Sequence, residues 1–198
     1  AFMVTLATYA LARGMALVIY NADSINVSDA AFLWLGGVSW GNMPVVIPFV
    51  ALVFVALSVL LYKSTFGRDV YAAGSNINTA FVLGRRPERT LVWVYVLSGA
   101  LAGLSAIITV GRVSSGQPWA GLYLEFDAIT AVILGGTSFV GGGGSIWGTL
   151  IGALIIAVLS NGLILTGVSD IWQFIIKGLV IIAAVALDRY RLKGGART

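Results

Sequence analysis

Long apolar segments separated by short polar stretches make up most of this sequence. Between Ala128 and Ser169 there is no Asp, Glu, Lys, Arg or His. A helix rises about 1.5 Å per residue, so a run of this length could cross a hydrocarbon layer of ~30 Å about twice. A soluble domain of this size does not easily bury such a stretch. The pattern therefore predicts a membrane protein.

Six apolar runs are long enough to be candidate membrane spans. They cover residues 1–20, 44–62, 91–110, 122–140, 146–166 and 171–187. The fourth needs Glu125 and Asp127 near its start to reach membrane length, so it is either a full span or a re-entrant segment buried by protein. We expect an all-α fold, a polytopic bundle of transmembrane helices forming a single domain over residues 1–198.

The basic residues predict how the spans are oriented. Loop 21–43 has no Lys or Arg, whereas loop 63–90 has five basic residues and the tail 188–198 has four. Cytoplasmic loops of membrane proteins are enriched in Lys and Arg. We therefore expect loop 63–90 and the C-terminal tail in the cytoplasm, and loop 21–43 on the opposite side.

Composition supports this class and excludes others. Apolar residues make up 59% of the chain and charged residues 10%, against roughly 25% charged in soluble domains. Cys and His are absent, which excludes disulfides, Cys or His metal sites and His-based acid–base chemistry. The carboxylate pairs Asp23 with Asp29 and Glu125 with Asp127 lie at loop edges without a partner base, so solvated charge explains them better than catalysis. No catalytic, cofactor-binding or metal-binding group is predicted.

The start of the chain and the placement of its basic residues support two further predictions. The segment Ala1-Phe2-Met3-Val4 opens inside an apolar run with no positively charged region before it, so it does not resemble a signal peptide. We expect the chain to be a piece of a longer protein. Its basic residues flank apolar segments without alternating aromatic residues, so nucleic-acid binding is not expected.

Glycines mark expected contacts and hinges. Gly99 with Gly103, and Gly148 with Gly152, are GxxxG patterns that let two helix backbones approach closely, either inside the bundle or at a dimer face. The cluster near 135–144 lacks the GK[ST] ending of a phosphate-binding loop and is expected to be a hinge between two spans. The predicted hinge and packing residues are Gly135, Gly136, Gly141, Gly142, Gly148 and Gly152.

Polar groups within the spans are candidates for a translocation path. A charge at membrane depth costs about 2.5–3.5 kcal/mol on insertion scales, so Arg13 and Lys177 are candidates to line a water-filled path. The alternatives are that Arg13 lies near the cytoplasmic end of a broken first span and that Lys177 is paired. The partner of Lys177 would then be Asp127 or Asp170. The candidate path residues are Asn161, Gln173, Lys177, Asp127 and Thr130; hydrogen bonds between helices are the alternative role for the polar ones.

Loop 63–90 contains a candidate amphipathic element. Residues 71–84 are expected to form a short helix ended by Gly84, with Ile77, Ala80 and Phe81 on one apolar face. Such a helix either docks on a partner protein or lies flat on the lipid surface.

Several blocks together resemble one family. Gly67-Arg-Asp-Val-Tyr-Ala-Ala-Gly-Ser-Asn76 resembles the GRxxYAxGxN segment of the permease subunits of ribose-type bacterial ABC sugar importers, and the block from Glu125 to Ser138 is similar to their ELDAIAAVVLGGTS block. Matches continue at residues 114–118, 148–153 and 161–163. The resemblance covers nearly the whole chain and places it in the C-terminal two-thirds of such a permease.

The resemblance implies a transmembrane permease of the bacterial inner membrane that passes a monosaccharide of the ribose, xylose or galactose class by alternating access. Its implied partners are a cytoplasmic ATPase subunit, which would hydrolyse ATP, a periplasmic sugar-binding protein, membrane lipid and a second permease copy, identical or not. The permease itself would bind no nucleotide or other cofactor and would not be an enzyme. The residues implied to couple to the ATPase are Gly74, Asn76, Ile77, Ala80, Phe81 and Gly84.

The chain departs from the family pattern at the coupling loop. The family usually has an acidic residue in place of Ile77, often a basic one in place of Phe81, and Lys or Arg where Gly143 and Ser145 stand. Branched-chain amino-acid permeases share the glycine-rich block and remain an alternative. An ion-coupled secondary transporter is another, although such proteins usually carry acidic or His relays in their spans.

Overall fold

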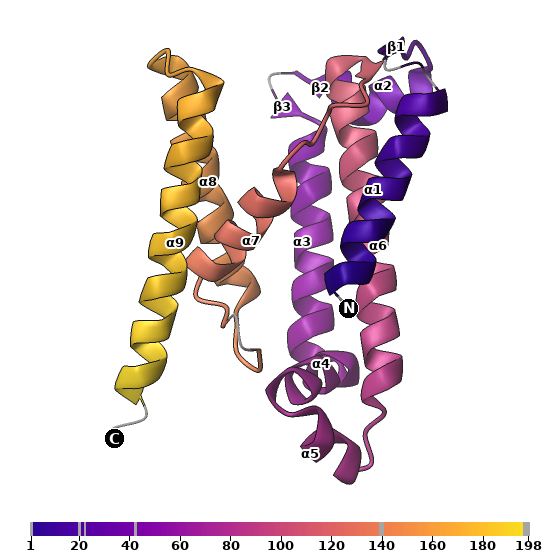
Figure 1. Ribbon diagram of the computed structural model, residues 1–198. Coiled ribbons are helices and arrows are strands. Elements are labelled where there is room, and N and C mark those ends of the chain that lie inside the picture. Colours follow the sequence, from indigo (N-terminus) through magenta and orange to yellow (C-terminus); the bar gives the residue numbers. More distant parts are fainter. Residues whose placement is uncertain (1, 20, 22, 42, 139–140, 196–198) are drawn as a thin grey trace. The chain divides into compact units, whose positions relative to one another are not determined.

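The described elements are almost all helices (Figure 1). The computed structural model describes residues 2–195 except 20, 22, 42 and 139–140, and it leaves undescribed a few side chains, including those of Asp170 and of residues 187–195. The helices are α1 Phe2–Ile19, α2 Ala30–Gly37, α3 Val46–Lys63, α4 Thr65–Ser75, α5 Ile77–Val82, α6 Pro87–Val113, α7 Leu124–Leu134, α8 Ile146–Leu165 and α9 Asp170–Gly195.

The strands are short, and one of the two pairs joins segments that are far apart in sequence. β1 Ile25–Asn26 pairs antiparallel with β4 Ser115–Gly116, and β2 Ser39–Trp40 pairs antiparallel with β3 Met43–Pro44. The predicted outer loop 21–43 is therefore partly ordered, since it contains α2 as well as β1 and β2. The β1–β4 pair ties its start to the segment after α6.

The chain divides into two compact units. One comprises residues 1–57 and 93–121, and the other comprises residues 58–92 and 122–198. The first holds α1, α2 and most of α3 and α6. The second holds the end of α3, the helices α4 and α5, the start of α6 and all of α7, α8 and α9. That residues 1–198 form a single domain stays a prediction.

Three of the described helices are long and apolar enough to cross a membrane. They are Val46–Lys63, Pro87–Val113 and Ile146–Leu165, and shorter apolar stretches occupy Met3–Ile19 and Ile171–Ala184. The expected all-helical membrane architecture is confirmed. The helix α9 continues past residue 187 to Gly195, so the backbone of the predicted tail is helical up to that residue. The basic side chains of this tail, which are predicted to lie in the cytoplasm, are outside the described residues.

The predicted fourth span is only partly helical. Helix α7 has 11 residues, from Leu124 to Leu134, which corresponds to a length of about 16 Å. This is about half of a hydrocarbon layer. Of the two readings left open for 122–140, a full helical span does not agree with this length, whereas a re-entrant segment does. The helix ends where Gly135 and Gly136 follow Leu134, and Gly136 has a positive φ of 84°.

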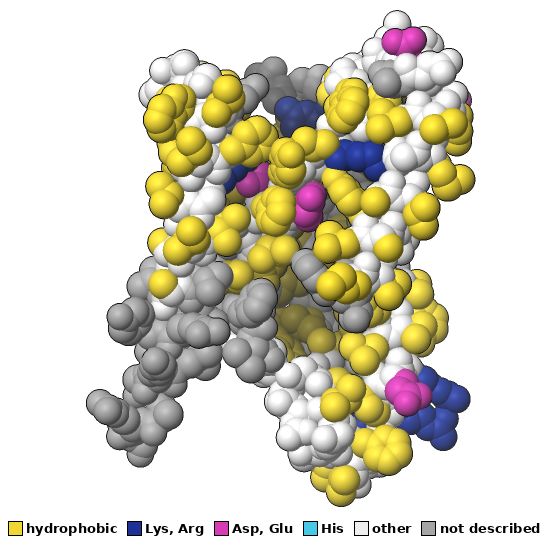
Figure 2. All heavy atoms as spheres, in the orientation of Figure 1, with side chains coloured by type: hydrophobic (Ala, Val, Ile, Leu, Met, Phe, Trp, Pro, Cys, Tyr) yellow, Lys and Arg dark blue, Asp and Glu magenta, His cyan; other side chains and the backbone are white. Residues whose placement is uncertain are grey.

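Apolar side chains cover the outside of the helices rather than filling a core. Figure 2 shows hydrophobic side chains over much of the visible described surface and few charged ones. Among the described residues, the buried apolar ones are Ala80, Ala131, Ile133, Ile156 and Ala184. A soluble monomer rarely exposes apolar patches on this scale. The distribution is that of helices whose solvent is lipid.

Candidate functional site

The predicted coupling segment consists of two helices that meet at Asn76. Its side-chain oxygen Oδ1 accepts hydrogen bonds from the backbone N–H groups of Asn78 at 3.0 Å and Thr79 at 3.1 Å. Its own backbone N–H donates to the carbonyl of Ala72 at 3.2 Å. One residue therefore ends α4 and caps α5. Asparagine is among the preferred N-cap residues because its side chain replaces a missing intrahelical partner.

The predicted helix end at Gly84 is confirmed, and the single helix predicted over 71–84 is wrong. Gly84 has a φ of +74°, and the next N–H, that of Arg85, donates to the carbonyl of Ala80 at 3.1 Å. This is a Schellman-type end, which favours glycine. The helix is interrupted upstream because Asn76 has an extended backbone.

The apolar residues of α5 differ in burial. Ala80 is buried, with 2% of its surface exposed, whereas Ile77 and Phe81 point outward. Phe81 is 72% exposed, and the two residues after it, Val82 and Leu83, are exposed to a similar degree. We call residues 81–83 the α5 tip. It is a run of three exposed apolar side chains at the end of α5.

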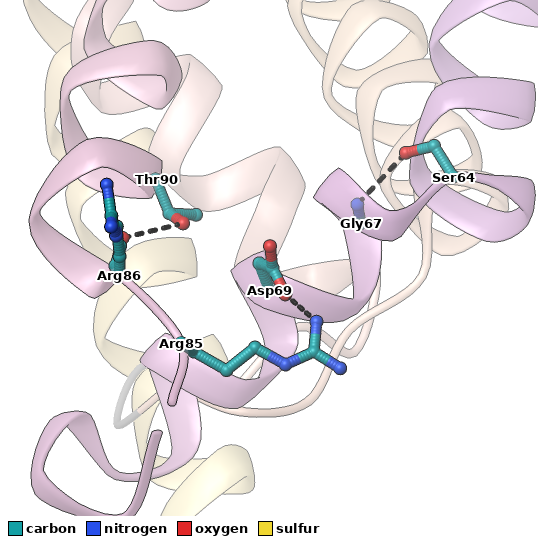
Figure 3. A network of polar contacts seen from close by, with 6 residues as sticks. All are labelled: Ser64, Gly67, Asp69, Arg85, Arg86 and Thr90. Atoms are coloured by element: carbon teal, nitrogen blue, oxygen red, sulfur yellow. Dashed lines mark hydrogen bonds and ion pairs between the residues drawn. The ribbon is translucent and has the colours of Figure 1, made fainter. Parts of the chain in front are cut away.

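Polar contacts fix this segment to the start of α6 (Figure 3). The guanidinium of Arg85 forms an ion pair with Asp69 of α4. The hydroxyl of Thr90, a buried residue, donates to the carbonyl of Arg86 at 3.3 Å. The Arg85–Asp69 pair is partly exposed, with side chains 40% and 28% accessible, so it fixes geometry more than it adds stability.

A tight corner joins α3 to α4. Ser64 is the N-cap of α4, and its hydroxyl accepts a hydrogen bond from the N–H of Gly67 at 3.2 Å (Figure 3). A Cβ at Gly67 would overlap the carbonyl of Leu61. Only glycine allows this approach, so α4 is held closely against the end of α3.

A glycine loop, residues 141–144, packs against the end of α4. A Cβ at Gly141 would lie 2.5 Å from the carbonyl oxygen of Gly74, and a Cβ at Gly142 would lie 2.8 Å from Ser75. Both loop glycines have positive φ, 102° and 77°. The predicted coupling residue Gly74 and two predicted hinge glycines are thus brought into backbone contact.

Two tyrosines extend this contact to the start of α8. The phenol of Tyr71 in α4 donates to the carbonyl of Gly144 at 2.9 Å. The phenol of Tyr62 in α3 lies 3.1 Å from the hydroxyl of Ser145 and accepts from the N–H of Ile146 at 3.3 Å. Burial, and secondarily Tyr62, raises the pKa of Tyr71, so its phenol stays protonated as a donor.

Sequence reasoning missed the roles of both tyrosines and of Ser145. Ser145 is the N-cap of α8, and its hydroxyl accepts from the N–H of Gly148 at 3.4 Å. A serine directly before an apolar run is a recognised helix-start signal. It could have been read, whereas the tyrosine contacts, which join residues more than 70 positions apart, could not.

Glycines also set the crossing of α7 and α8. A Cβ at Gly152 would overlap the carbonyl oxygen of Ala131, and one at Gly148 would overlap that of Gly135. The predicted packing role of these glycines therefore has a definite partner within the chain. Elsewhere, a Cβ at Gly99 or Gly103 would find no atom of the described chain within 4 Å. Of the two GxxxG patterns, the one at Gly148 and Gly152 therefore lies in a close backbone contact of the described residues, and the one at Gly99 and Gly103 does not.

An ion pair joins α7 to α9. The ammonium Nζ of Lys177 lies 2.7 Å from Oδ2 of Asp127, and about three quarters of each side chain is buried. Pairing with Asp127, one of the two predicted partners, is confirmed, and the Asp170 side chain lies outside the described residues. The expectation that Asp127 is a solvated loop charge is wrong, because Asp127 lies in the first turn of α7 and faces a cation.

The remaining path candidates lie in different settings. Thr130 is buried, and its hydroxyl donates to the carbonyl of Phe126 one turn earlier at 2.6 Å. The amide of Gln173 donates to the carbonyl of Val168 at 3.0 Å, just before its own helix. Asn161 is exposed on α8. Their role in a path remains a prediction.

Arg13 is engaged within its own unit. Its guanidinium donates to the phenol of Tyr9 one turn earlier and to the carbonyl of Ala120 at 3.5 Å. The guanidinium carbon also lies 5.1 Å from the centre of the Tyr9 ring, within cation–π range. These contacts partly compensate the charge within the apolar helix α1.

A cavity of about 370 Å³ lies beside the glycine loop. It is lined by the end of α3, by α4, by α7 and by the start of α8. The lining includes Tyr71, Gly74, Val132 and Thr149. All four belong to the second unit. The glycine loop and α4 therefore line the same cavity.

The sequence model of the family described as "Branched-chain amino acid transport system / permease component" matches residues 1–185. No solved structure matches.

Curated relatives cover nearly the whole chain. "Ribose import permease protein RbsC" of Bacillus subtilis (strain 168) is 45% identical over 190 residues, which are 95% of this chain and 59% of the relative. "D-allose transport system permease protein AlsC" of Escherichia coli (strain K12) is 39% identical over 188 residues, 95% of this chain and 58% of the relative. "L-arabinose transport system permease protein AraH" of the same strain is 35% identical over 193 residues, with shares of 98% and 59%. The chain thus spans about three fifths of these relatives.

Proposed function

Because the chain belongs to the family of permease components named for branched-chain amino acid transport, we propose that it forms the C-terminal part of an ABC importer permease that passes a monosaccharide across the bacterial inner membrane. The observation that carries the proposal is 45% identity to a ribose import permease over 95% of the chain. The apolar helices and the exposed apolar surface agree with a multi-pass membrane protein.

A sugar is the better substrate class than a branched-chain amino acid. The relatives described above are named for ribose, allose and arabinose, and the segment Gly67–Asn76 resembles the sugar branch. Ribose, the sugar of the most similar of these three, is the first probe to use. Uptake of labelled ribose by cells that carry the permease should be lost on its deletion and should resist competition by excess leucine. If deletion left ribose uptake unchanged and instead abolished uptake of labelled leucine, the amino-acid alternative would be indicated.

The energy source distinguishes the proposal from secondary transport. We expect ATP hydrolysis on a separate cytoplasmic subunit, with the permease itself not an enzyme. Depletion of ATP with the ion gradient maintained should abolish uptake. Continued uptake under that condition would favour an ion-coupled carrier and would contradict the proposal.

The α5 tip is the proposed contact with the ATPase. Its apolar side chains are exposed although they lie in the loop with five basic residues, which is expected in the cytoplasm. A partner protein would remove the exposed apolar surface from water. Single cysteines at Phe81 and Val82 should cross-link to the ATPase, whereas one at Met43 in the predicted outer loop should not. No cross-link at either tip position would contradict this contact.

The remaining partners follow from the proposed importer. A periplasmic binding protein would deliver the sugar on the side of loop 21–43, and a second permease copy would complete the path. The C-terminus would lie in the cytoplasm. A reporter enzyme that is active only in the cytoplasm, fused after Thr198, should be active, and the same reporter inserted after Gly41 should be inactive.

A further inference from the structure

The coupling helices and the glycine loop share an unusually close backbone contact. Gly74 and Gly142 approach so closely that a Cβ at Gly74 would lie 3.0 Å from the nitrogen of Gly142. Such a contact transmits displacement directly, because there is no flexible side chain between the two backbones. A side chain added at Gly74, Gly141 or Gly142 would push the two elements apart.

Hydrogen bonds extend this contact from the glycine loop to the start of α8. Tyr71 holds Gly144 from α4, and Tyr62 holds both Ser145 and the first N–H of α8 from the end of α3. The loop is also closed on itself, since the N–H of Ser138 donates to the carbonyl of Gly143 at 2.9 Å. The segment that precedes α8 is therefore hydrogen-bonded both to α4, through Tyr71, and to the end of α3, through Tyr62.

From α8 the contacts continue to α7 and α9. The Gly152–Ala131 and Gly148–Gly135 approaches bring the backbone of α8 directly against that of α7 and its C-terminal end. The Asp127–Lys177 ion pair then joins α7 to α9. All these residues belong to one compact unit. The cavity beside the loop leaves space into which the loop can move.

We propose that the glycine loop, residues 141–144, is the joint through which movement of the coupling helix α4 reaches α7 and α8, and that Tyr71 and Tyr62 are the positioning residues of this joint. The inference rests on the proposed function, since it assumes that an ATPase moves α4. It adds to that function a transmission element distinct from the docking surface.

Two variants interrupt the joint by different means. Tyr71→Phe removes one hydrogen-bond donor and keeps the ring. Gly142→Ala introduces a Cβ 2.8 Å from Ser75 at a residue with positive φ. Two glycines supply matched controls. Gly136→Ala carries the same backbone strain, with φ of +84°, and Gly143→Ala carries no such strain; a Cβ at either would find no described atom within 4 Å.

The test uses the permease assembled with its ATPase in proteoliposomes, with labelled ribose, its binding protein and ATP. Tyr71→Phe and Gly142→Ala should raise the ATP hydrolysed per ribose imported, by roughly fivefold for the loss of one hydrogen bond. Both controls should keep the wild-type ratio. A wild-type ratio in both joint variants, or an equal fall of hydrolysis and uptake, would overturn the inference, because a merely structural role lowers both rates together.

A second measurement needs no sugar. Hydrogen exchange at the first amides of α8 should change in the wild type when a non-hydrolysable ATP analogue is added, and should not change in Gly142→Ala. The same response in both proteins would overturn the joint. A wild type that shows this response but imports no ribose would overturn the proposed substrate and leave the joint supported, so the two failures are distinguishable.

Discussion

The ammonium of Lys177 and the carboxylate of Asp127 lie 2.7 Å apart and join α9 to the first turn of α7. Beside this pair, the ring of Tyr123 meets that of Phe174 edge to face, with centroids 5.0 Å apart. The two contacts together hold the start of α7 against α9. Because each charged side chain is only about a quarter exposed, the pair is partly removed from solvent and removal of one partner would leave an uncompensated charge.

Replacing either partner of this ion pair alone should destabilise the permease. Lys177→Met and Asp127→Asn should each cost about 1–3 kcal/mol, since each strands the opposite charge. The exchanged variant Asp127→Lys with Lys177→Asp should recover most of the loss. The measurement is the thermal unfolding midpoint in detergent. Single variants as stable as the wild type would show that water or lipid headgroups satisfy both charges.

The glycines of the α7–α8 crossing should resist substitution. Gly152→Ala places a methyl group against the Ala131 carbonyl, and the overpacking should cost about 1–3 kcal/mol. Gly103→Ala is the matched control in the other GxxxG pattern, where a Cβ would find no described atom within 4 Å. It should leave stability unchanged or raise it slightly, because Ala favours helix over Gly. Equal effects at both positions in the same unfolding assay would contradict the assigned packing.

Hydropathy located most of the helices and left the nature of one apolar run open. That run continues to residue 140, so hydropathy and length allowed either a full span or a re-entrant segment over 122–140, whereas the helix ends at Leu134. Two consecutive glycines end it, and the close approach of Gly135 to Gly148 explains why no larger residue stands there. That reason is tertiary and cannot be read from a window of sequence.

In the candidate site, too, some features follow from the local sequence and others depend on the fold. Gly84 follows a local rule for helix ends, and its role was predictable. Asn76 also follows a local rule, since asparagine before a short apolar run is an N-cap signal. The contacts of Tyr71 with Gly144 and of Lys177 with Asp127 span 73 and 50 positions. For Lys177 the sequence indicated that a counter-charge was needed, but only the fold selects Asp127.

Removing the cap at Asn76 should loosen α5 without unfolding the protein. Asn76→Ala loses both side-chain hydrogen bonds to the first turn, which should cost about 1 kcal/mol locally. The amides of Asn78 and Thr79 should then exchange several-fold faster with deuterium. Asn76→Asp, which keeps the accepting oxygen, should exchange like the wild type. Unchanged exchange in Asn76→Ala would mean that packing of Ala80 alone holds the helix.

The polar residues of α8 and α9 should affect sugar affinity if they line the path. Asn161→Ala and Gln173→Ala each remove a group that can hydrogen-bond a sugar hydroxyl, and each should raise the KM for ribose uptake about 3- to 10-fold. ATP hydrolysis stimulated by saturating binding protein should stay near the wild-type rate. Thr166→Ala is the control, because the Thr166 hydroxyl already bonds to carbonyls of its own helix at 3.0 Å. Unchanged uptake in a triple variant that also carries Lys177→Ala would remove these residues from the path and leave them a purely structural role.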